Sequence, residues 1–124
     1  MQNQVLTIKQ CQELMALKLD MSNASLMWDL NPHDSYDEYE LTFSNAIMMD
    51  LSRFIPTYTL NDIFNIFDTK ILQQDLTINI NIDLLNKTIY IEKIDEYHYY
   101  FTGNTILDAA FKMLKFCLQN KIIC

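Results

Sequence analysis

The sequence NTILDAAFKMLKFCLQ, residues 104–119, decides the fold, because its polar positions predict a helix that is buried over most of its circumference. Its polar positions within the helix are Asp108, Lys112, Lys115 and Gln119. Spacings of four, three and four residues put these side chains in one narrow line along an α-helix. All other positions from Ile106 to Leu118 are apolar, so other parts of the chain must cover them. We therefore expect this helix to be a core element that says little about chemistry.

Three β-strands are predicted directly before this helix, at residues 76–82, 88–94 and 97–102. The first, LTININI, alternates strictly, so one face is expected to be buried and aliphatic and the other polar. Ile89 and Ile91 of the second strand are expected to lie on the same face as these isoleucines. In the turn at residues 83–87, Asn86 is suited to a positive φ. The pattern predicts an antiparallel meander that leads across Gly103 into the helix.

Capping boxes predict the starts of three helices. The boxes pair Thr7 with Gln10, Thr59 with Asp62 and Thr105 with Asp108. The first helix is expected to end near residues 18–20 and to place Cys11 and Leu14 on its apolar face, and the second to span residues 60–67.

Short extended segments are predicted between the first two helices. Residues 24–29 are predicted to form a strand that is terminated by Asn31 and Pro32. Residues 38–43 are predicted to form the start of another strand. Residues 45–54 fit a helical turn or a buried strand equally well. We therefore expect one α+β domain over residues 1–124, with an antiparallel sheet of about four or five strands, about three helices, and the C-terminal helix most buried.

Glycine is scarce, with one residue in 124 against roughly nine expected from average usage. Phosphate-binding loops need several glycines, so nucleotide-binding fingerprints of that kind are excluded. We expect no secretion signal and no membrane span, because no basic start precedes an apolar run and no apolar stretch reaches spanning length. Three cysteines without CxxC spacing indicate a reduced, cytoplasmic compartment, with Cys11 and Cys117 as core residues.

The net charge of −7 is concentrated in one segment. Between Asp20 and Asp68 there are nine acidic residues and one basic residue, Arg53, which gives −8. The remainder carries seven acidic and eight basic residues, or +1. Such a surface repels free nucleic acid, whose binding depends on lysine and arginine contacts to phosphates, and it attracts a basic protein surface.

The residue types for catalysis and metal binding are present without the required patterns. The two histidines, His33 and His98, read as a solvent-exposed loop residue and a partly buried or edge residue of a strand. His33, Asp34 and Asp37 could form part of a hydrated metal site. A tight site needs three or four ligands fixed by a scaffold, and this tyrosine-bearing loop gives no such spacing, so we expect no metal and no cofactor. The carboxylates nearby have polar neighbours and are expected to be ionised, which leaves no proton donor for acid–base catalysis. The tyrosines and Phe101 of residues 97–101 are expected to cover the sheet rather than to stack on RNA bases, because Lys93 is the single nearby cation.

The segment from Trp28 to Glu40 is the best functional signal, although a solvated acidic loop also explains it. Aromatic side chains anchor protein interfaces, and carboxylates around them steer basic partners. We expect the following residues to contact a partner: Trp28, Asp29, Asp34, Tyr36, Asp37, Glu38, Tyr39 and Glu40.

The segments LTIKQCQEL, ASLMW, IPTYTLNDIF and LDAAFKMLKFCLQNKII resemble small proteins carried by prophages and mobile elements of Bacteroides-like bacteria. The matching positions are caps and core residues, so the resemblance implies a shared fold and transfers no functional site. A small, acidic, glycine-poor protein of this kind also looks like an anti-CRISPR inhibitor. Such inhibitors often bind the basic channel or a regulatory surface of an RNA-guided nuclease, and the composition looks like that of bacteria in which type VI, RNA-targeting systems occur.

Three functional hypotheses follow. The first is a non-enzymatic, phage-encoded inhibitor that binds a host RNA-guided nuclease in the bacterial cytoplasm through residues 28–40. The second is a structural or assembly module of a phage-like element, which includes a homodimer formed through an exposed strand or tyrosine surface. The third is a small enzyme with a site at His33 or His98.

Overall fold

The computed structural model describes residues 4–30, 40–43 and 54–123. Its elements are α1 (Ile8–Ala16), β1 (Leu26–Asp29), β2 (Glu40–Phe43), β3 (Phe54–Thr57), α2 (Leu60–Phe67), the π-helical turn η3 (Asp68–Leu72), β4 (Ile78–Asp83), β5 (Thr88–Lys93), β6 (Tyr97–Thr102) and α3 (Ile106–Gln119). The α+β class is confirmed, with two antiparallel sheets of three strands in place of one larger sheet. The chain divides into two compact units, residues 1–62 and 63–124, so the expectation of a single domain stays a prediction.

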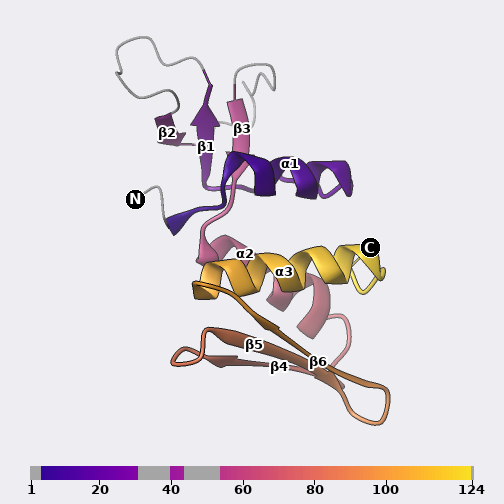
Figure 1. The fold of residues 1–124 in the computed structure, drawn as a ribbon. Coiled ribbons are helices and arrows are strands. Elements are labelled where there is room, and N and C mark those ends of the chain that lie inside the picture. The colour runs from indigo at the N-terminus through magenta and orange to yellow at the C-terminus, as the bar shows by residue number, and fades with distance from the viewer. Residues whose placement is uncertain (1–3, 31–39, 44–53, 124) are drawn as a thin grey trace. The chain divides into compact units, whose positions relative to one another are not determined.

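In the N-terminal unit, β1 is the central strand of a sheet with the order β2-β1-β3 (Figure 1). Trp28 of β1 lies opposite Leu41 on one side and Ile55 on the other. The segment before α1 joins this unit through a β-bridge between Val5 and Thr59. The strand predicted at residues 24–29 is confirmed over its last four residues, Leu26–Asp29. Most of the ambiguous stretch at residues 45–54 lies outside the described residues.

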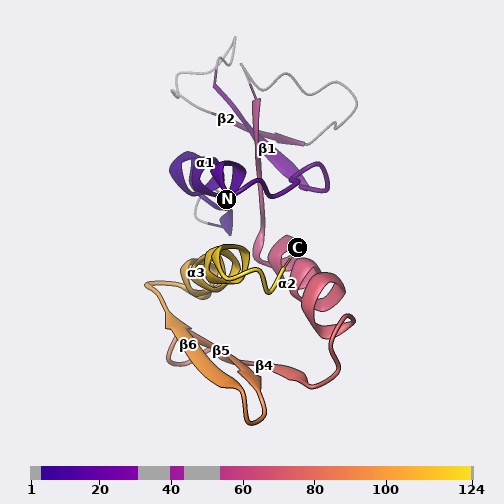
Figure 2. The ribbon, with the colours of Figure 1, turned by 90° about the vertical axis from the view of Figure 1, so that its right-hand side faces the viewer.

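In the C-terminal unit, the meander β4-β5-β6 is confirmed and α3 packs on β5 and β6 (Figures 1 and 2). Ile80 lies opposite Ile91, so these isoleucines share one face as predicted. On that face the ring of Phe116 lies 4.7 Å from Tyr99 and 5.3 Å from Phe101 between centroids. The buried residues of α3 are Leu107, Ala109, Ala110, Phe111, Met113, Leu114 and Cys117. The predicted burial of the C-terminal helix is confirmed.

The capping boxes begin all three helices at the predicted residues. Thr7 and Gln10 satisfy both reciprocal hydrogen bonds, and so do Thr59 and Asp62. At α3, the Thr105 hydroxyl accepts from the backbone N–H of Asp108 at 3.1 Å. Each cap supplies an acceptor for a backbone N–H that has no partner within the helix, which fixes where the helix begins.

Gly103 is required by close packing between the end of β6 and the first turn of α3. A methyl group built on Gly103 would lie 2.5 Å from the Asp108 Cβ and 2.8 Å from the Ala109 nitrogen. Real side chains do not approach this closely, so any other residue would push the helix away from the strand. The single glycine of the chain therefore stands where the chain enters its most buried helix.

Two local predictions are wrong because short polar side chains reshape the turns. The strand predicted from Leu76 begins at Ile78, since Asp75 accepts from the backbone N–H of both Thr77 and Ile78 and holds a turn there. Leu76 is consequently 89% exposed.

The positive φ expected at Asn86 occurs at Lys87, where φ is 51°. The Asp83 carboxylate accepts from both the backbone and the side-chain N–H of Asn86. These two bonds tie Asn86 into the turn. The left-handed residue is therefore the next one along the chain.

Lysines occupy left-handed positions at the ends of α1 and α3, where glycine is usual. Lys18 has φ 66° and Lys121 has φ 57°. After α3, Lys121 N–H donates to the Leu118 carbonyl and Ile122 N–H to the Cys117 carbonyl, which is the Schellman pattern. A side chain in this backbone conformation costs about 1–2 kcal/mol that glycine avoids.

Replacing Lys121 by glycine is expected to stabilise the protein by about 1 kcal/mol, because the left-handed backbone loses its steric penalty. Urea unfolding followed by circular dichroism measures the change. Lys121→Ala is the matched control, since it removes the same charge and keeps a Cβ, and it should give no gain. Equal stabilisation by both substitutions would assign the effect to the lysine charge instead.

Candidate functional site

The predicted partner segment begins and ends on two paired strands. Asp29, the last residue of β1, lies directly opposite Glu40, the first residue of β2. The pairing brings the two ends of the segment together where β1 ends and β2 begins. Five predicted contact residues, Asp34, Tyr36, Asp37, Glu38 and Tyr39, lie outside the described residues, as does His33.

Trp28 has a structural role in the N-terminal unit. Its side chain is 7% exposed, and its indole N–H donates to the backbone carbonyl of Leu6 at 2.9 Å. The Thr57 hydroxyl donates to the same carbonyl at 2.9 Å. Asp29 is also buried, with 9% exposure. The contact that both residues were expected to make with a partner stays a prediction.

A polar network built on Asp62 uses part of the acidic charge internally. The Asp62 carboxylate accepts from the Ser25 hydroxyl at 2.6 Å, from the Ser25 backbone N–H at 3.3 Å and from the Thr59 backbone N–H at 3.0 Å. It therefore joins the entry to β1 to the start of α2. Three hydrogen bonds in a buried position give this carboxylate a role in the fold.

Tyr58 lies beside this network and is fully buried. Its hydroxyl donates to the Asn23 side-chain oxygen, 3.0 Å away. Burial raises the pKa of Tyr58 well above its usual range, and the nearby carboxylates of Asp20 and Asp62 raise it further. The phenol therefore stays neutral and serves as a hydrogen-bond donor.

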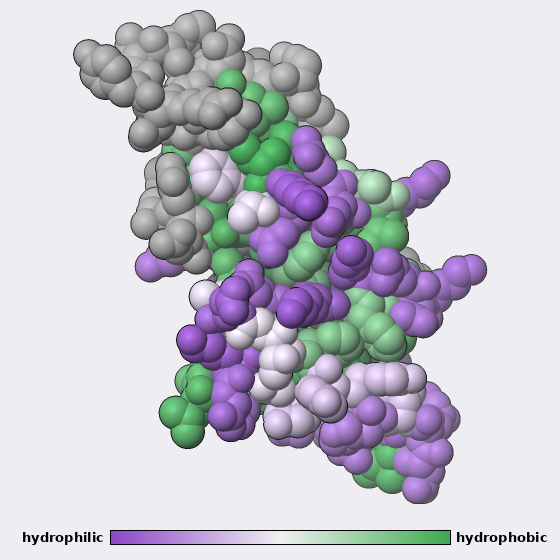
Figure 3. All heavy atoms as spheres, viewed as in Figure 1, coloured by the Kyte–Doolittle hydropathy of each residue, from purple (hydrophilic) through white to green (hydrophobic). Residues whose placement is uncertain are grey.

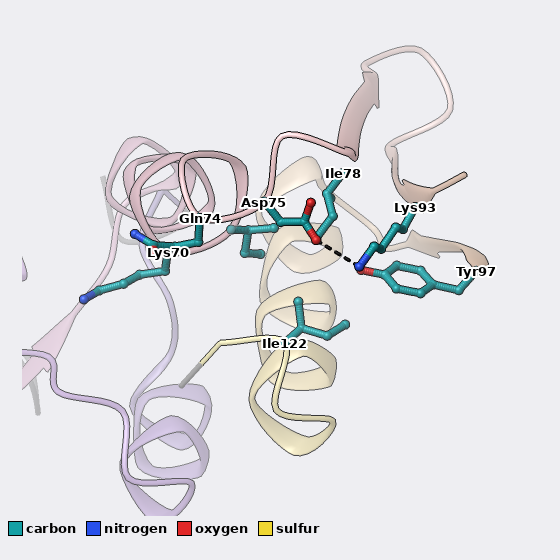
Figure 4. A pocket seen from close by; sticks show the side chains of 8 residues that line it. Lys70, Gln74, Asp75, Ile78, Lys93, Tyr97 and Ile122 are labelled. Atoms are coloured by element: carbon teal, nitrogen blue, oxygen red, sulfur yellow. Dashed lines mark ion pairs between the residues drawn. The ribbon is translucent and has the colours of Figure 1, made fainter. Parts of the chain in front are cut away.

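The C-terminal unit has an open pocket of about 250 Å³ (Figure 4). Its lining residues are Lys70, Ile71, Gln74, Asp75, Ile78, Lys93, Tyr97 and Ile122. Figure 4 shows Asp75 and Lys93 joined across the pocket, with the Tyr97 ring beside Lys93. Sequence reasoning missed this site because its residues come from η3, the strands and the end of the chain. The one local signal was the three-residue spacing of Lys93 and Glu96.

The charges in the pocket neutralise one another. Lys93 Nζ lies 3.0 Å from an Asp75 oxygen and 3.2 Å from a Glu96 oxygen. Hydrogen bonds from the Thr77 hydroxyl and then from Lys93 lower the pKa of Asp75 to about 2. The bonds to Asp75 and Glu96 raise the pKa of Lys93. Both groups stay ionised at neutral pH, which fits a structural ion pair better than an acid–base catalyst.

The face of the C-terminal sheet opposite α3 presents polar and aromatic side chains. Around Tyr90, the ring centroids of His98 and Tyr100 lie at 6.0 and 6.3 Å. Tyr100 is 66% exposed, so it departs from the expectation that the aromatics cover the core, whereas Phe101 packs on Phe116 on the other face. Tyr99 also contacts Phe116 there but stays 43% exposed. The charged residues of this face, Asp83 and Glu92, are acidic and disfavour nucleic-acid phosphates. His98 is exposed on an edge strand, as expected.

Both described cysteines are buried free thiols, as predicted. Burial raises the pKa of Cys11 to about 11 and that of Cys117 to about 12. A thiol nucleophile needs a lowered pKa and access to substrate, so these two residues are core side chains.

Within the described residues, no group of three or more His, Cys, Asp and Glu side chains is arranged to hold a metal ion. Among the described residues, we find no helix with the length and apolar character that a membrane span requires. Comparison with protein-family models, curated proteins and solved structures found no match to this chain. Function must be argued from the residues themselves.

The buried setting of Trp28 predicts that iodide quenches its fluorescence poorly in the native protein and strongly in urea. Trp28 is the single tryptophan, so the emission reports this site alone. Trp28→Phe should destabilise the protein by about 1–3 kcal/mol, because a buried hydrogen bond and part of the packing are lost. Efficient iodide quenching before unfolding would contradict the buried position.

The hydrogen bonds around Asp75 predict how its pKa responds to substitution. Removing the Thr77 hydroxyl with Thr77→Val and removing the Lys93 charge with Lys93→Met should each raise the pKa of Asp75, because the bonds from Thr77 and then from Lys93 are the two largest causes of its lowering. Since the folded pKa is depressed, the stabilisation is present above the unfolded pKa near 4 and is lost as the pH falls towards 2. Carboxyl NMR titration measures both shifts. An unchanged pKa in Thr77→Val would contradict the assigned cause.

Proposed function

We propose that this protein is a non-enzymatic binding protein whose acidic N-terminal unit engages a basic surface of another protein. The uneven division of charge between the two units carries this proposal. Residues 1–62 contain nine acidic and three basic residues, a net charge of −6, whereas residues 63–124 contain seven acidic and six basic residues, a net charge of −1. Charge of one sign on one unit steers a partner of opposite charge toward it.

The internal bonds of the N-terminal unit narrow the choice of contact residues. Asp62 is used by the fold, and Asp29 is buried. The dense run of carboxylates between these two positions comprises Asp34, Asp37, Glu38 and Glu40. The segment that contains this run follows β1 and leads into β2, and these two strands pair with each other, which supports its use as a binding element.

The specific partner that we propose is an RNA-guided nuclease of the type VI, RNA-targeting kind, with this protein as its phage-encoded anti-CRISPR inhibitor in the bacterial cytoplasm. Two features support this choice. The caps and apolar positions resemble those of prophage proteins, and the acidic charge suits a channel built to hold nucleic acid. The buried free thiols of Cys11 and Cys117 are compatible with a reducing cytoplasm.

A second candidate function is an assembly module of a phage-like mobile element. The observation that favours it is β4, an edge strand of the C-terminal sheet that pairs on one side only among the described residues. Edge strands of this kind join sheets between subunits.

The inhibitor proposal predicts that the protein slows cleavage of target RNA by a purified type VI nuclease loaded with guide RNA. Lysine substitutions at Asp34, Asp37, Glu38 and Glu40 together should abolish the inhibition, because attraction becomes repulsion. Binding of the same nuclease is measured by biolayer interferometry at two salt concentrations. The affinity of the natural protein should fall with added salt.

The matched control reverses four acidic residues of the C-terminal unit, Asp68, Glu92, Asp95 and Glu96, which changes the net charge by the same amount. This control should still inhibit. Equal loss in both variants would show a non-specific effect of net charge. Retained inhibition in the first variant would exclude the acidic run as the contact surface.

A further inference from the structure

β4 is an edge strand of the C-terminal sheet, and all its residues before the last one, Asp83, are uncharged. β4 pairs with β5 on one side, and no described strand pairs with it on the other. Between Asp75 and Asp83 its sequence contains Ile and Asn with Leu76 and Thr77, and it has neither the lysine nor the proline that usually protects an exposed edge.

The outward-facing backbone groups of this edge can be assigned. Ile78 N–H donates to the Asp75 carbonyl at 3.2 Å, so it is not directed at β5. Ladder hydrogen bonds alternate along an antiparallel pair, so Ile80 and Ile82 also turn their N–H and C=O groups away from β5. The open side of β4 therefore offers donors and acceptors from Ile80 and Ile82 and the carbonyl of Ile78.

The opposite edge of the same sheet differs. By the same alternation, Thr102 of β6 directs its carbonyl outward, and Lys112 Nζ donates to that carbonyl at 2.7 Å. α3 also packs against β6, whereas the stronger contacts of β4 are with β5 and η3. Within the described chain, β4 is thus the more accessible edge for another strand.

Exposed apolar side chains lie on and beside β4. Their exposed fractions are 89% for Leu76, 43% for Ile82, 71% for Leu84 and 89% for Leu85. Figure 3 shows hydrophobic side chains gathered at the β4–β5 turn. Exposed leucines just before and just after one edge strand are typical of a surface that another chain covers.

We propose that the β4 edge pairs antiparallel with the β4 edge of a second copy of this chain, with a two-fold axis at Ile80. This register is self-complementary. Ile80 exchanges both backbone hydrogen bonds with its symmetry mate, and Ile82 N–H donates to the Ile78 carbonyl of the second copy. Asn79 faces Asn81, so amide side chains meet across the axis.

The same register accounts for the exposed leucines and opposes no like charges. Leu76, in the turn just before β4 of one copy, and Leu84, just after β4 of the other, lie at the same end of the paired edges. Asp83 lies opposite Thr77 rather than another carboxylate. The C-terminal unit, which carries the pairing edge, has a net charge of only −1 out of the −7 of the whole chain, so this unit adds little to the repulsion between two copies. The result is a continuous six-stranded sheet. The inference does not rest on the nuclease-inhibitor function, and it specifies the self-pairing that the assembly function proposed above would use.

Sedimentation velocity over a concentration series tests this pairing. The natural protein should sediment as a dimer at high concentration. Asn79→Lys with Asn81→Lys should weaken the dimer about tenfold or more, because lysines then face each other across the axis, and Asn79→Glu with Asn81→Glu should do the same. Both asparagines are exposed, so these variants should stay folded, as circular dichroism checks. An equimolar mixture of the two variants should restore the dimer through Lys–Glu pairs.

The control places the same two lysines on the same sheet face at the other edge, with His98→Lys and Tyr100→Lys. This variant should remain dimeric. A monomeric natural protein at its highest soluble concentration would overturn the proposal. So would dissociation of the β6 control, or a mixture of the charged variants that stays monomeric.

Discussion

The carbonyl oxygen of Leu6 is the point on which the N-terminal unit depends. It accepts hydrogen bonds from the Trp28 indole and the Thr57 hydroxyl, and the Cys11 thiol lies 4.0 Å away. The N–H of Leu6 donates to the Tyr58 carbonyl at 3.1 Å. One residue just before α1 thus holds β1, β3 and the first turn of the helix together. Loss of this acceptor would leave the Trp28 indole N–H and the Thr57 hydroxyl without these hydrogen bonds in an apolar interior.

The C-terminal unit depends on steric fit rather than on a polar centre. Gly103 lets α3 begin directly after β6, and the Phe116 ring then reaches Tyr99 and Phe101. With its one glycine used there, the chain ends both α1 and α3 on lysines in the left-handed region. The helices end where tertiary packing requires, at a local cost in backbone strain.

The two units also differ in how they use charge. In the N-terminal unit, Asp62 is enclosed by hydrogen bonds, and the remaining excess of carboxylates supports a contact with a basic partner. In the C-terminal unit, Asp75 and Glu96 form ion pairs with Lys93, and the unpaired β4 edge, uncharged before Asp83, supports pairing between copies. A protein with one acidic unit and one self-pairing unit would present its acidic surfaces in duplicate, which raises the apparent affinity for a partner with repeated basic sites.

Local sequence determined the helices, the meander of β4 to β6, the single polar line and the buried faces of α3, and the core positions of Cys11 and Cys117. These features depend on spacings of a few residues and on caps that neighbouring side chains complete. Tertiary structure alone decided that Trp28 is enclosed, that the strands form two sheets, and that Lys93 meets Asp75. The acceptor of the Trp28 indole lies 22 residues away in sequence, and the partners of each strand are chosen by long-range backbone pairing. Periodicity shows which side chains must be buried, but it does not show which distant residues pack against them.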